Sequence, residues 1–150
     1  GLGTMTAPNP VAVKKCITAA IKNAGIEANE INAINGHLTA TSKDSLEIQN
    51  WSEALGRKGV DFPYINSLKS IGHCLSGAGS IESVATVLQL HQGFVFPNIN
   101  CEDLHAEIID IIDSSRIPQQ LVTTELNFIA KASFGFGDVN GCVILKKYST

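Results

Sequence analysis

The sequence lacks the features that mark several classes of protein. It has no basic run and a formal net charge of −3, so nucleic acid is not expected as the main partner. No apolar run is long enough to cross a membrane. The four cysteines, Cys16, Cys74, Cys101 and Cys142, have no paired spacing. A disulfide scaffold, a zinc ribbon and a metal site are therefore not expected, and a reducing cytoplasm is the expected compartment.

What remains is the composition of one globular domain. The chain has 150 residues, of which 44% are hydrophobic and 17% are charged. That length is enough to bury a core, and that balance argues against disorder. There is no internal repeat and no low-complexity linker.

Helical and strand patterns alternate in the first half of the chain. Asn9 and Pro10 predict the cap and first turn of a helix that Gly25 ends. Residues 31–35 predict a short strand. A second helix, capped by Ser42 or Asp44, follows and ends at Gly56. Its inner face is marked by Ile48, Trp51 and Leu55, and Trp51 is expected in the core.

The second half predicts one more helix and several extended segments. A strand is expected at residues 64–68 and a helix at 79–92. The apolar residues of this helix cover more than one face, so it is expected to be buried on most sides. An edge segment (94–100), a short buried segment around residues 108–112, a strand (126–132), a turn (133–141) and a returning strand (142–148) complete the order.

This order predicts an α/β layered fold. The first helix would normally cross over from an earlier parallel strand, and no such strand is in the sequence. We therefore expect the chain to be part of something larger.

Polar side chains gather where three predicted strands end. His37 follows the first strand, Lys69 and His73 follow the second, and a glycine-rich turn follows the strand at 126–132. Sites in open α/β sheets lie at such strand ends. Two histidines could donate hydrogen bonds to one carbonyl oxygen and so stabilise an enolate or oxyanion, an effect of about 2.7–4 kcal/mol per donor. Lys69 could pair with Glu82.

Structural explanations compete with this site. His91 and His105 are interpreted as structural, and His37 and His73 could be structural too, because each follows an apolar segment. Lys69 alone could be a surface lysine. Glu82 alone could complement a helix dipole.

The remaining candidates also have plain explanations. Residues 134–137 could form a hairpin turn with two apolar plugs. Cys74 adjoins His73, but neighbouring side chains diverge, which favours packing over a nucleophilic role. The other three cysteines are expected to be small core residues.

Several motifs resemble a known family. Residues 35–41 read Asn-Gly-His-Leu-Thr-Ala-Thr, residues 69–73 read Lys-Ser-Ile-Gly-His, and residues 77–83 continue that second motif. Residues 133–140 read Ser-Phe-Gly-Phe-Gly-Asp-Val-Asn, and residues 5–8 resemble the approach to the first helix. Together they resemble the carboxyl-terminal half of a β-ketoacyl-acyl carrier protein synthase that elongates fatty acids. The resemblance implies a thiolase-like half with a mixed sheet and helices on both faces.

The resemblance also implies roles for individual residues. His37 and His73 would promote decarboxylation of malonyl-acyl carrier protein and stabilise the carbanion, while Lys69 and Glu82 would order the site. The growing chain would be carried as a thioester on a cysteine.

Further roles concern the substrate arm and the acyl pocket. Thr39 and Thr41 would hydrogen-bond the phosphopantetheine of acyl carrier protein. Phe136 would gate the acyl pocket, and its N–H would contribute to an oxyanion hole. No separate cofactor is implied. The implied partners are acyl carrier protein, the amino-terminal half of the enzyme and, for the whole protein, a second copy.

The sequence departs from the family pattern in four respects. The spacing from Lys69 to His73 is one residue shorter, and Leu38 and Asp138 each stand where the family has glycine. None of the four cysteines matches the nucleophile motif, which lies in the amino-terminal half. We therefore expect this chain alone not to condense acyl chains. A non-catalytic thiolase-like partner subunit is the alternative, and the distance between the two imidazoles discriminates between them.

Overall fold

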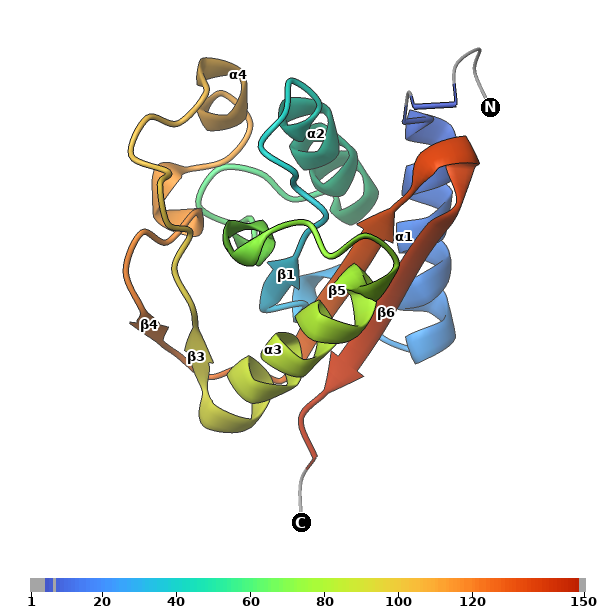
Figure 1. Ribbon diagram of the computed structural model, residues 1–150. Helices are drawn as coiled ribbons and strands as arrows, with labels where there is room; N and C mark the ends of the chain where they lie inside the picture. The colour runs from blue at the N-terminus through green and yellow to red at the C-terminus, as the bar shows by residue number, and fades with distance from the viewer. Residues whose placement is uncertain (1–4, 7, 149–150) are drawn as a thin grey trace.

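The computed structural model describes residues 5–6 and 8–148 (Figure 1). Ala7, within the motif at residues 5–8, lies outside them. The helices are α1 (Pro10–Ala24), α2 (Asp44–Leu55), α3 (Ala78–Gln92) and α4 (Ala106–Ile109). The strands are β1 (Ala33–Asn35), β2 (Tyr64–Asn66), β3 (Phe94–Val95), β4 (Val122–Thr123), β5 (Phe128–Phe134) and β6 (Asn140–Lys146). Short 3-10 turns lie at Ala28–Glu30, Lys69–Ile71, Leu75–Gly77, Ser114–Arg116 and Phe136–Asp138.

The main sheet is mixed, as expected. Its order is β2-β1-β5-β6, with β1 parallel to both β2 and β5 and with β6 antiparallel to β5. The central strand β1 pairs Asn35 with Asn66 on one side and with Lys131 on the other. Strands β3 and β4 form a separate antiparallel pair.

Helices cover both faces of this sheet, which confirms the predicted layering. In Figure 1, α3 crosses in front of β5 and β6, while α1 lies behind β6 and packs against α2. The carboxyl ends of β1 and β2 open toward α2 and the first turn of α3. Among the described residues, no helix has the length and apolar content needed to span a bilayer.

The first helix has the ends that its sequence predicts. The Asn9 side chain accepts hydrogen bonds from the N–H groups of Val11 (3.1 Å) and Ala12 (3.4 Å), so it caps α1. Pro10 is the first helical residue, and Gly25 ends the helix with a φ of 66°.

The predicted start of α2 is wrong. Its N-cap is Lys43, whose side chain makes no capping bond, and neither Ser42 nor Asp44 caps the helix. Asp44 is instead the first helical residue and its carboxylate turns back toward the preceding loop. The predicted helix end at Gly56 is confirmed.

Strand boundaries also differ from the prediction. β1 begins two residues later than expected, at Ala33, and ends at Asn35 as predicted. β2 is shorter than expected because the polar loop leaves the sheet directly after Asn66. β5 runs on to Phe134 and β6 begins at Asn140, so the connecting turn is shorter than expected. Only the first two residues of the edge segment at 94–100 are paired. In the segment around 108–112, Ile112 is fully buried but Ile109 is exposed.

The core lies between the sheet, α1 and α2. Trp51 is fully buried there, as predicted, together with Ile17, Ile34, Ile48, Phe62 and Ile65. The cysteines are free, as expected, and all four are partly buried. Cys101 and Cys142 pack against this core, so the prediction that they fill it is confirmed for those two.

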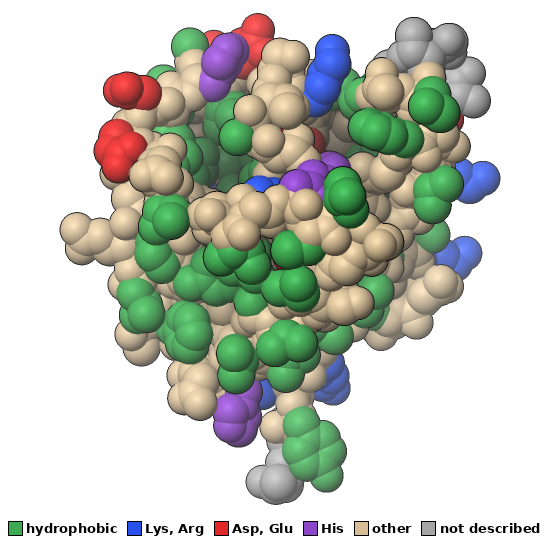
Figure 2. Space-filling view, in the orientation of Figure 1, with side chains coloured by type: hydrophobic (Ala, Val, Ile, Leu, Met, Phe, Trp, Pro, Cys, Tyr) green, Lys and Arg blue, Asp and Glu red, His purple; other side chains and the backbone are tan. Residues whose placement is uncertain are grey.

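Helix α3 contradicts the prediction that it would be buried on most sides. The residues that it turns toward the sheet are largely polar, with Glu82, Thr86 and Gln89 buried. Apolar residues lie on its outer side, where Val84 is 63% exposed. Figure 2 shows hydrophobic side chains gathered over this helix. We call Ile81, Val84, Val87 and Leu88 the outer face of α3.

Candidate functional site

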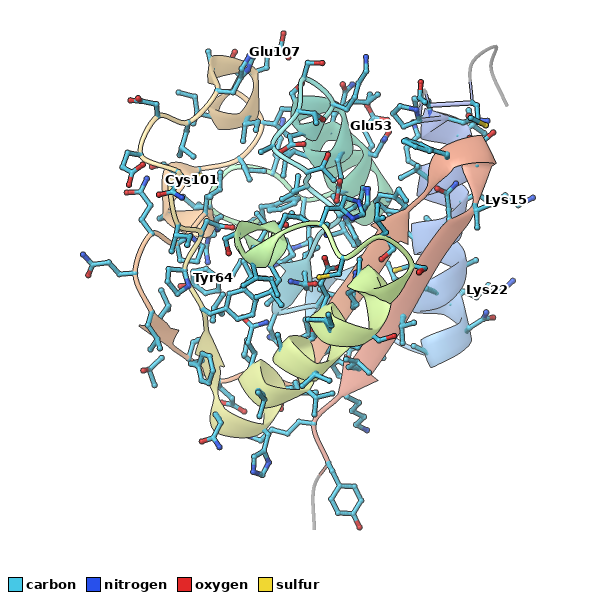
Figure 3. The ribbon with its side chains drawn as sticks, viewed as in Figure 1. Lys15, Lys22, Glu53, Tyr64, Cys101 and Glu107 are labelled. Atoms are coloured by element: carbon cyan, nitrogen blue, oxygen red, sulfur yellow. The ribbon has the colours of Figure 1, made fainter. Side chains whose placement is uncertain are left out.

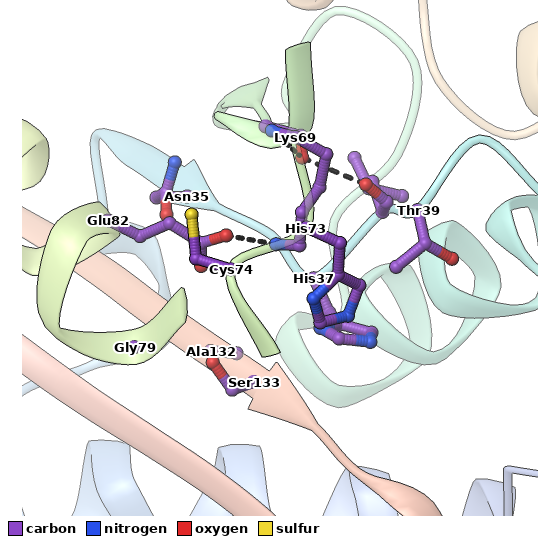
Figure 4. Close-up of polar contacts among 12 residues, drawn as sticks. Asn35, His37, Thr39, Lys69, His73, Cys74, Gly79, Glu82, Ala132 and Ser133 are labelled. Carbon is purple, nitrogen blue, oxygen red and sulfur yellow. Dashed lines mark hydrogen bonds and ion pairs between the residues drawn. The ribbon is translucent and has the colours of Figure 1, made fainter. Parts of the chain in front are cut away.

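The loops that follow β1 and β2 bring the two predicted histidines together. The ring centroids of His37 and His73 are 5.5 Å apart, and the rings meet edge to face at 81°. Figure 4 shows them side by side at the carboxyl ends of these strands. This proximity favours the predicted oxyanion-stabilising pair over two unrelated structural histidines.

His37 is held in its neutral form. Burial, then the positive charge of Lys69 and the neighbouring His73, lowers the pKa of His37 to about 4. Its Nδ1 is buried and has no hydrogen-bond partner within the described part of the chain. The centroid of the His37 ring also lies 6.4 Å from the centroid of the Phe134 ring. A neutral imidazole can donate one hydrogen bond to a substrate oxygen without carrying a charge of its own.

Lys69 pairs with Glu82, as predicted, and a second lysine joins them. The Lys69 ammonium contacts one carboxylate oxygen of Glu82 (Figure 4), and the Lys131 ammonium lies 2.5 Å from the other. All three side chains are almost fully buried. Lys131 was not among the residues predicted for the site. The signal was a lysine inside an otherwise apolar strand, where a charge is retained only with partners.

Two acidic residues of α2 hold the loop that carries His37. Glu47 accepts hydrogen bonds from the N–H groups of His37 (2.7 Å) and Leu38 (2.9 Å). Asp44 accepts bonds from the next three N–H groups, at 3.1–3.3 Å. Burial raises the pKa of Glu47 to about 7. This role of Glu47 and Asp44 was not predicted, although two carboxylates in a first helical turn after a polar loop are a signal for it.

The next loop depends on one glycine. Gly72, directly before His73, has a φ of 100° and a ψ of 153°, and no atom lies within 4 Å of where a Cβ would be. The backbone there is available to glycine but strained for other residues. With this turn, the short spacing from Lys69 to His73 still allows both side chains to reach the site.

A cavity of about 460 Å³ opens beside the two histidines. Thr39 and Thr41 line it, with their hydroxyl oxygens 3.3 Å apart. Phe136 also lines it and is 69% exposed. The Phe134 ring packs against the Trp51 ring, with the two centroids 6.3 Å apart. Phe134, the last residue of β5, therefore packs against the core and also lines the cavity, whereas Phe136 lines the cavity from an exposed position.

The other candidate residues lie outside this site or have structural roles. His105 caps α4 by accepting a hydrogen bond from Glu107, and His91 is exposed in the last turn of α3. Cys74 is half-buried, and its thiol lies 3.6 Å from the Gly72 carbonyl oxygen. Among the residues that the structure describes, no cluster of His, Cys, Asp or Glu could hold a metal ion.

Sequence comparison places this geometry in a family. The model of the β-ketoacyl synthase C-terminal domain matches residues 2–102. The chloroplastic 3-oxoacyl-[acyl-carrier-protein] synthase II of Arabidopsis thaliana is 36% identical over 96% of this chain and 26% of its own length. The 3-oxoacyl-[acyl-carrier-protein] synthase 2 of Vibrio harveyi is 34% identical over 86% of this chain and 31% of its own length. The chain thus spans between a quarter and a third of the length of these relatives.

Solved structures agree with the sequence match. The ishigamide ketosynthase/chain length factor superposes with a TM-score of 0.87 at 27% identity, covering 98% of this chain and 35% of that one. A type II polyketide ketosynthase in complex with its acyl carrier protein has a TM-score of 0.85 at 28% identity, covering 99% and 36%. The chain therefore belongs to the β-ketoacyl synthase family, in which it corresponds to the carboxyl-terminal domain, and it has the thiolase-like fold.

Proposed function

We propose that this chain is the histidine-bearing half of a 3-oxoacyl-acyl carrier protein synthase of fatty acid biosynthesis. The observation that carries the proposal is the pair of imidazoles, 5.5 Å apart beside a cavity and a buried lysine–glutamate cluster. The reaction would be a decarboxylating condensation of malonyl-acyl carrier protein with an acyl-enzyme thioester. The curated relatives named as 3-oxoacyl-acyl carrier protein synthases support this substrate class.

The proposed chemistry uses the two histidines as hydrogen-bond donors. The bond between the malonyl carboxylate and its methylene carbon breaks, carbon dioxide leaves, and the electron pair passes to the thioester oxygen as an enolate. His37 and His73 donate to that oxygen. The enolate carbon then attacks the acyl thioester, whose cysteine sulfur leaves as a thiolate. That cysteine would come from the amino-terminal half.

The cavity would hold the carrier arm. Thr39 and Thr41 offer two hydroxyl groups at its wall, suited to the amide groups of phosphopantetheine. The exposed Phe136 would gate the acyl pocket, with its N–H in the oxyanion hole. Acyl carrier protein would be the partner, and the carrier-protein complex of a related ketosynthase supports this. No further cofactor is proposed.

The amino-terminal half would cover the outer face of α3. This apolar ridge adjoins the polar site, as expected of a surface that another domain buries. A homodimer is proposed for the complete protein. The cytoplasm remains our proposed compartment, although the Arabidopsis relatives include chloroplastic proteins.

The test is a chimaera in which this chain replaces the carboxyl-terminal half of the Vibrio harveyi synthase. We expect decarboxylation of malonyl-acyl carrier protein and condensation, and we expect His37→Ala or His73→Ala to lower the rate about 10²–10³-fold. His91→Ala, at an exposed position outside the site, is the matched control. Full condensation by either site variant, or by the isolated 150-residue chain, contradicts the proposal.

A non-catalytic partner subunit is the second candidate. The short spacing from Lys69 to His73 favours it, as do Leu38 and Asp138 at glycine positions. A chimaera that folds and binds acyl carrier protein but neither decarboxylates nor condenses would support this candidate.

A further inference from the structure

Lys131 has no role in the function proposed above, yet it is among the most confined charges in the molecule. It lies in the centre of β5 with its side chain 4% exposed. Its ammonium donates to the Ala132 carbonyl oxygen (2.5 Å) and to the Ser133 hydroxyl (2.9 Å), and pairs with Glu82 at 2.5 Å. The ammonium group thus has two hydrogen-bond acceptors and one ion-pair partner around it.

The cluster carries more positive than negative charge. Lys69 and Lys131 share the single carboxylate of Glu82, one on each oxygen, which leaves a net charge of plus one in a buried place. Without Lys131, the carboxylate and Lys69 would cancel. The second lysine thus offsets Glu82 and leaves the charge of Lys69 uncompensated.

That charge acts on the histidine pair. The positive charges of Lys69 and Lys131 both lower the pKa of His37, while Glu82 opposes them and His73 adds to them. Glu47, on α2, faces the same residue through the His37 backbone N–H. The excess positive charge therefore lies where an anion would meet the two imidazoles.

We propose that Lys131 is a positioning residue for an anionic substrate group. By holding one oxygen of Glu82, it keeps a net positive charge beside His37 and His73, and this charge attracts a carboxylate or an enolate oxygen. The identification of that anion with a malonyl carboxylate rests on the proposed function. The charge effect itself does not.

The test uses the 150-residue chain and malonate as the probe, with imidazole NMR signals as the readout. We expect Lys131→Met to weaken malonate binding by about fivefold or more at constant ionic strength and to raise the measured pKa of His37. Neutral dimethyl malonate should show no such change. Lys15→Met removes a charge from the exposed side of α1 (Figure 3) and should leave both readouts unchanged.

A double variant separates charge from structure. Glu82→Gln with Lys131→Met removes the contact between α3 and β5 but restores the net charge of plus one through Lys69. We expect malonate affinity and the pKa of His37 to return toward their original values. A double variant as weak as Lys131→Met, or a Lys131→Met chain that binds malonate unchanged, overturns the proposal. Neither readout needs condensation, so a chimaera that fails to condense contradicts only the proposed function.

Discussion

The Glu47 carboxylate accepts a hydrogen bond from the His37 backbone N–H. The pKa of the Glu47 carboxyl is raised, whereas the pKa of the His37 imidazole is lowered. Glu47 titrates near 7 instead of 4.5, so the folded chain holds an extra proton between these values and loses stability as pH rises through them. His37 titrates near 4 instead of 6.5, so the folded chain lacks a proton there and gains stability as pH rises. Between about pH 4.5 and 6.5, the loss of stability with rising pH that Glu47 causes therefore opposes the gain that His37 causes.

Replacing Glu47 should reveal the pH dependence of stability that His37 causes. Glu47→Gln keeps a hydrogen-bonding side chain but no longer titrates. We expect the stability of this variant to rise by on the order of 2 kcal/mol from pH 4.5 to 6.5, more steeply than that of the original chain. Urea denaturation at a series of pH values measures this, with Gln49→Glu at an exposed position of α2 as a control. If the free energies of unfolding of Glu47→Gln and of the original chain change with pH in parallel, the raised pKa of Glu47 is contradicted.

At this scale the sequence identified the groups that follow strands but not those that support them. His37, His73 and Lys69 were predictable because polar residues at strand ends point to a site. Lys131 and Glu47 were not, because whether an internal charge is paired depends on which strand and which helix meet it. Lys131 meets Glu82 only once α3 lies across β5.

Among the elements, α3 has the most unusual distribution of side chains. Gln89 accepts hydrogen bonds from the Asn66 side chain (2.7 Å) and the Phe96 N–H (3.0 Å) and is fully buried. It thereby ties the helix to β2 and to the segment after β3. The sequence predicted a helix here but not its orientation, since its apolar residues outnumber the polar ones that face inward.

Gln89→Ala should therefore destabilise the chain more than its location outside the apolar core suggests. The Phe96 N–H would lose its acceptor, and the NH₂ group of the Asn66 side chain would keep only its bond to the Phe96 carbonyl oxygen, at a cost of about 1–3 kcal/mol in the free energy of unfolding. Gln92→Ala, in the same helix at an exposed position, should change it by less than about 0.5 kcal/mol. Chemical denaturation of both variants gives the comparison, and equal midpoints would refute the role given to Gln89.

For the whole molecule, the outer face of α3 predicts behaviour in solution. A contiguous apolar surface on an isolated chain favours association with a second copy. We expect the 150-residue chain to self-associate as its concentration rises, and Val84→Lys with Leu88→Lys to shift it toward the monomer. Sedimentation velocity measures this. Val60→Lys, at a position that is equally exposed but lies outside α3, should leave association as it was.

The layered architecture could be predicted from alternating helical and strand patterns, and the family motifs extended it to a mixed sheet. The exposure of α3 could not be predicted, because an apolar helix in one chain can be buried by another. β2 was predicted too long because Leu68 continues the apolar pattern past Asn66, where the polar loop leaves the sheet. β5 and β6 have the predicted length, but each lies two residues nearer the connecting turn.

Gly72 gives protein engineers a way to change the placement of the His73 ring without changing the ring itself. Its left-handed backbone sets the direction in which the chain delivers the second imidazole. Because open space surrounds it, a methyl group added there would meet no neighbour, and its whole effect would be torsional. Substitutions at this one position would therefore rotate the His73 ring relative to the His37 ring while the apolar interior stays as it is.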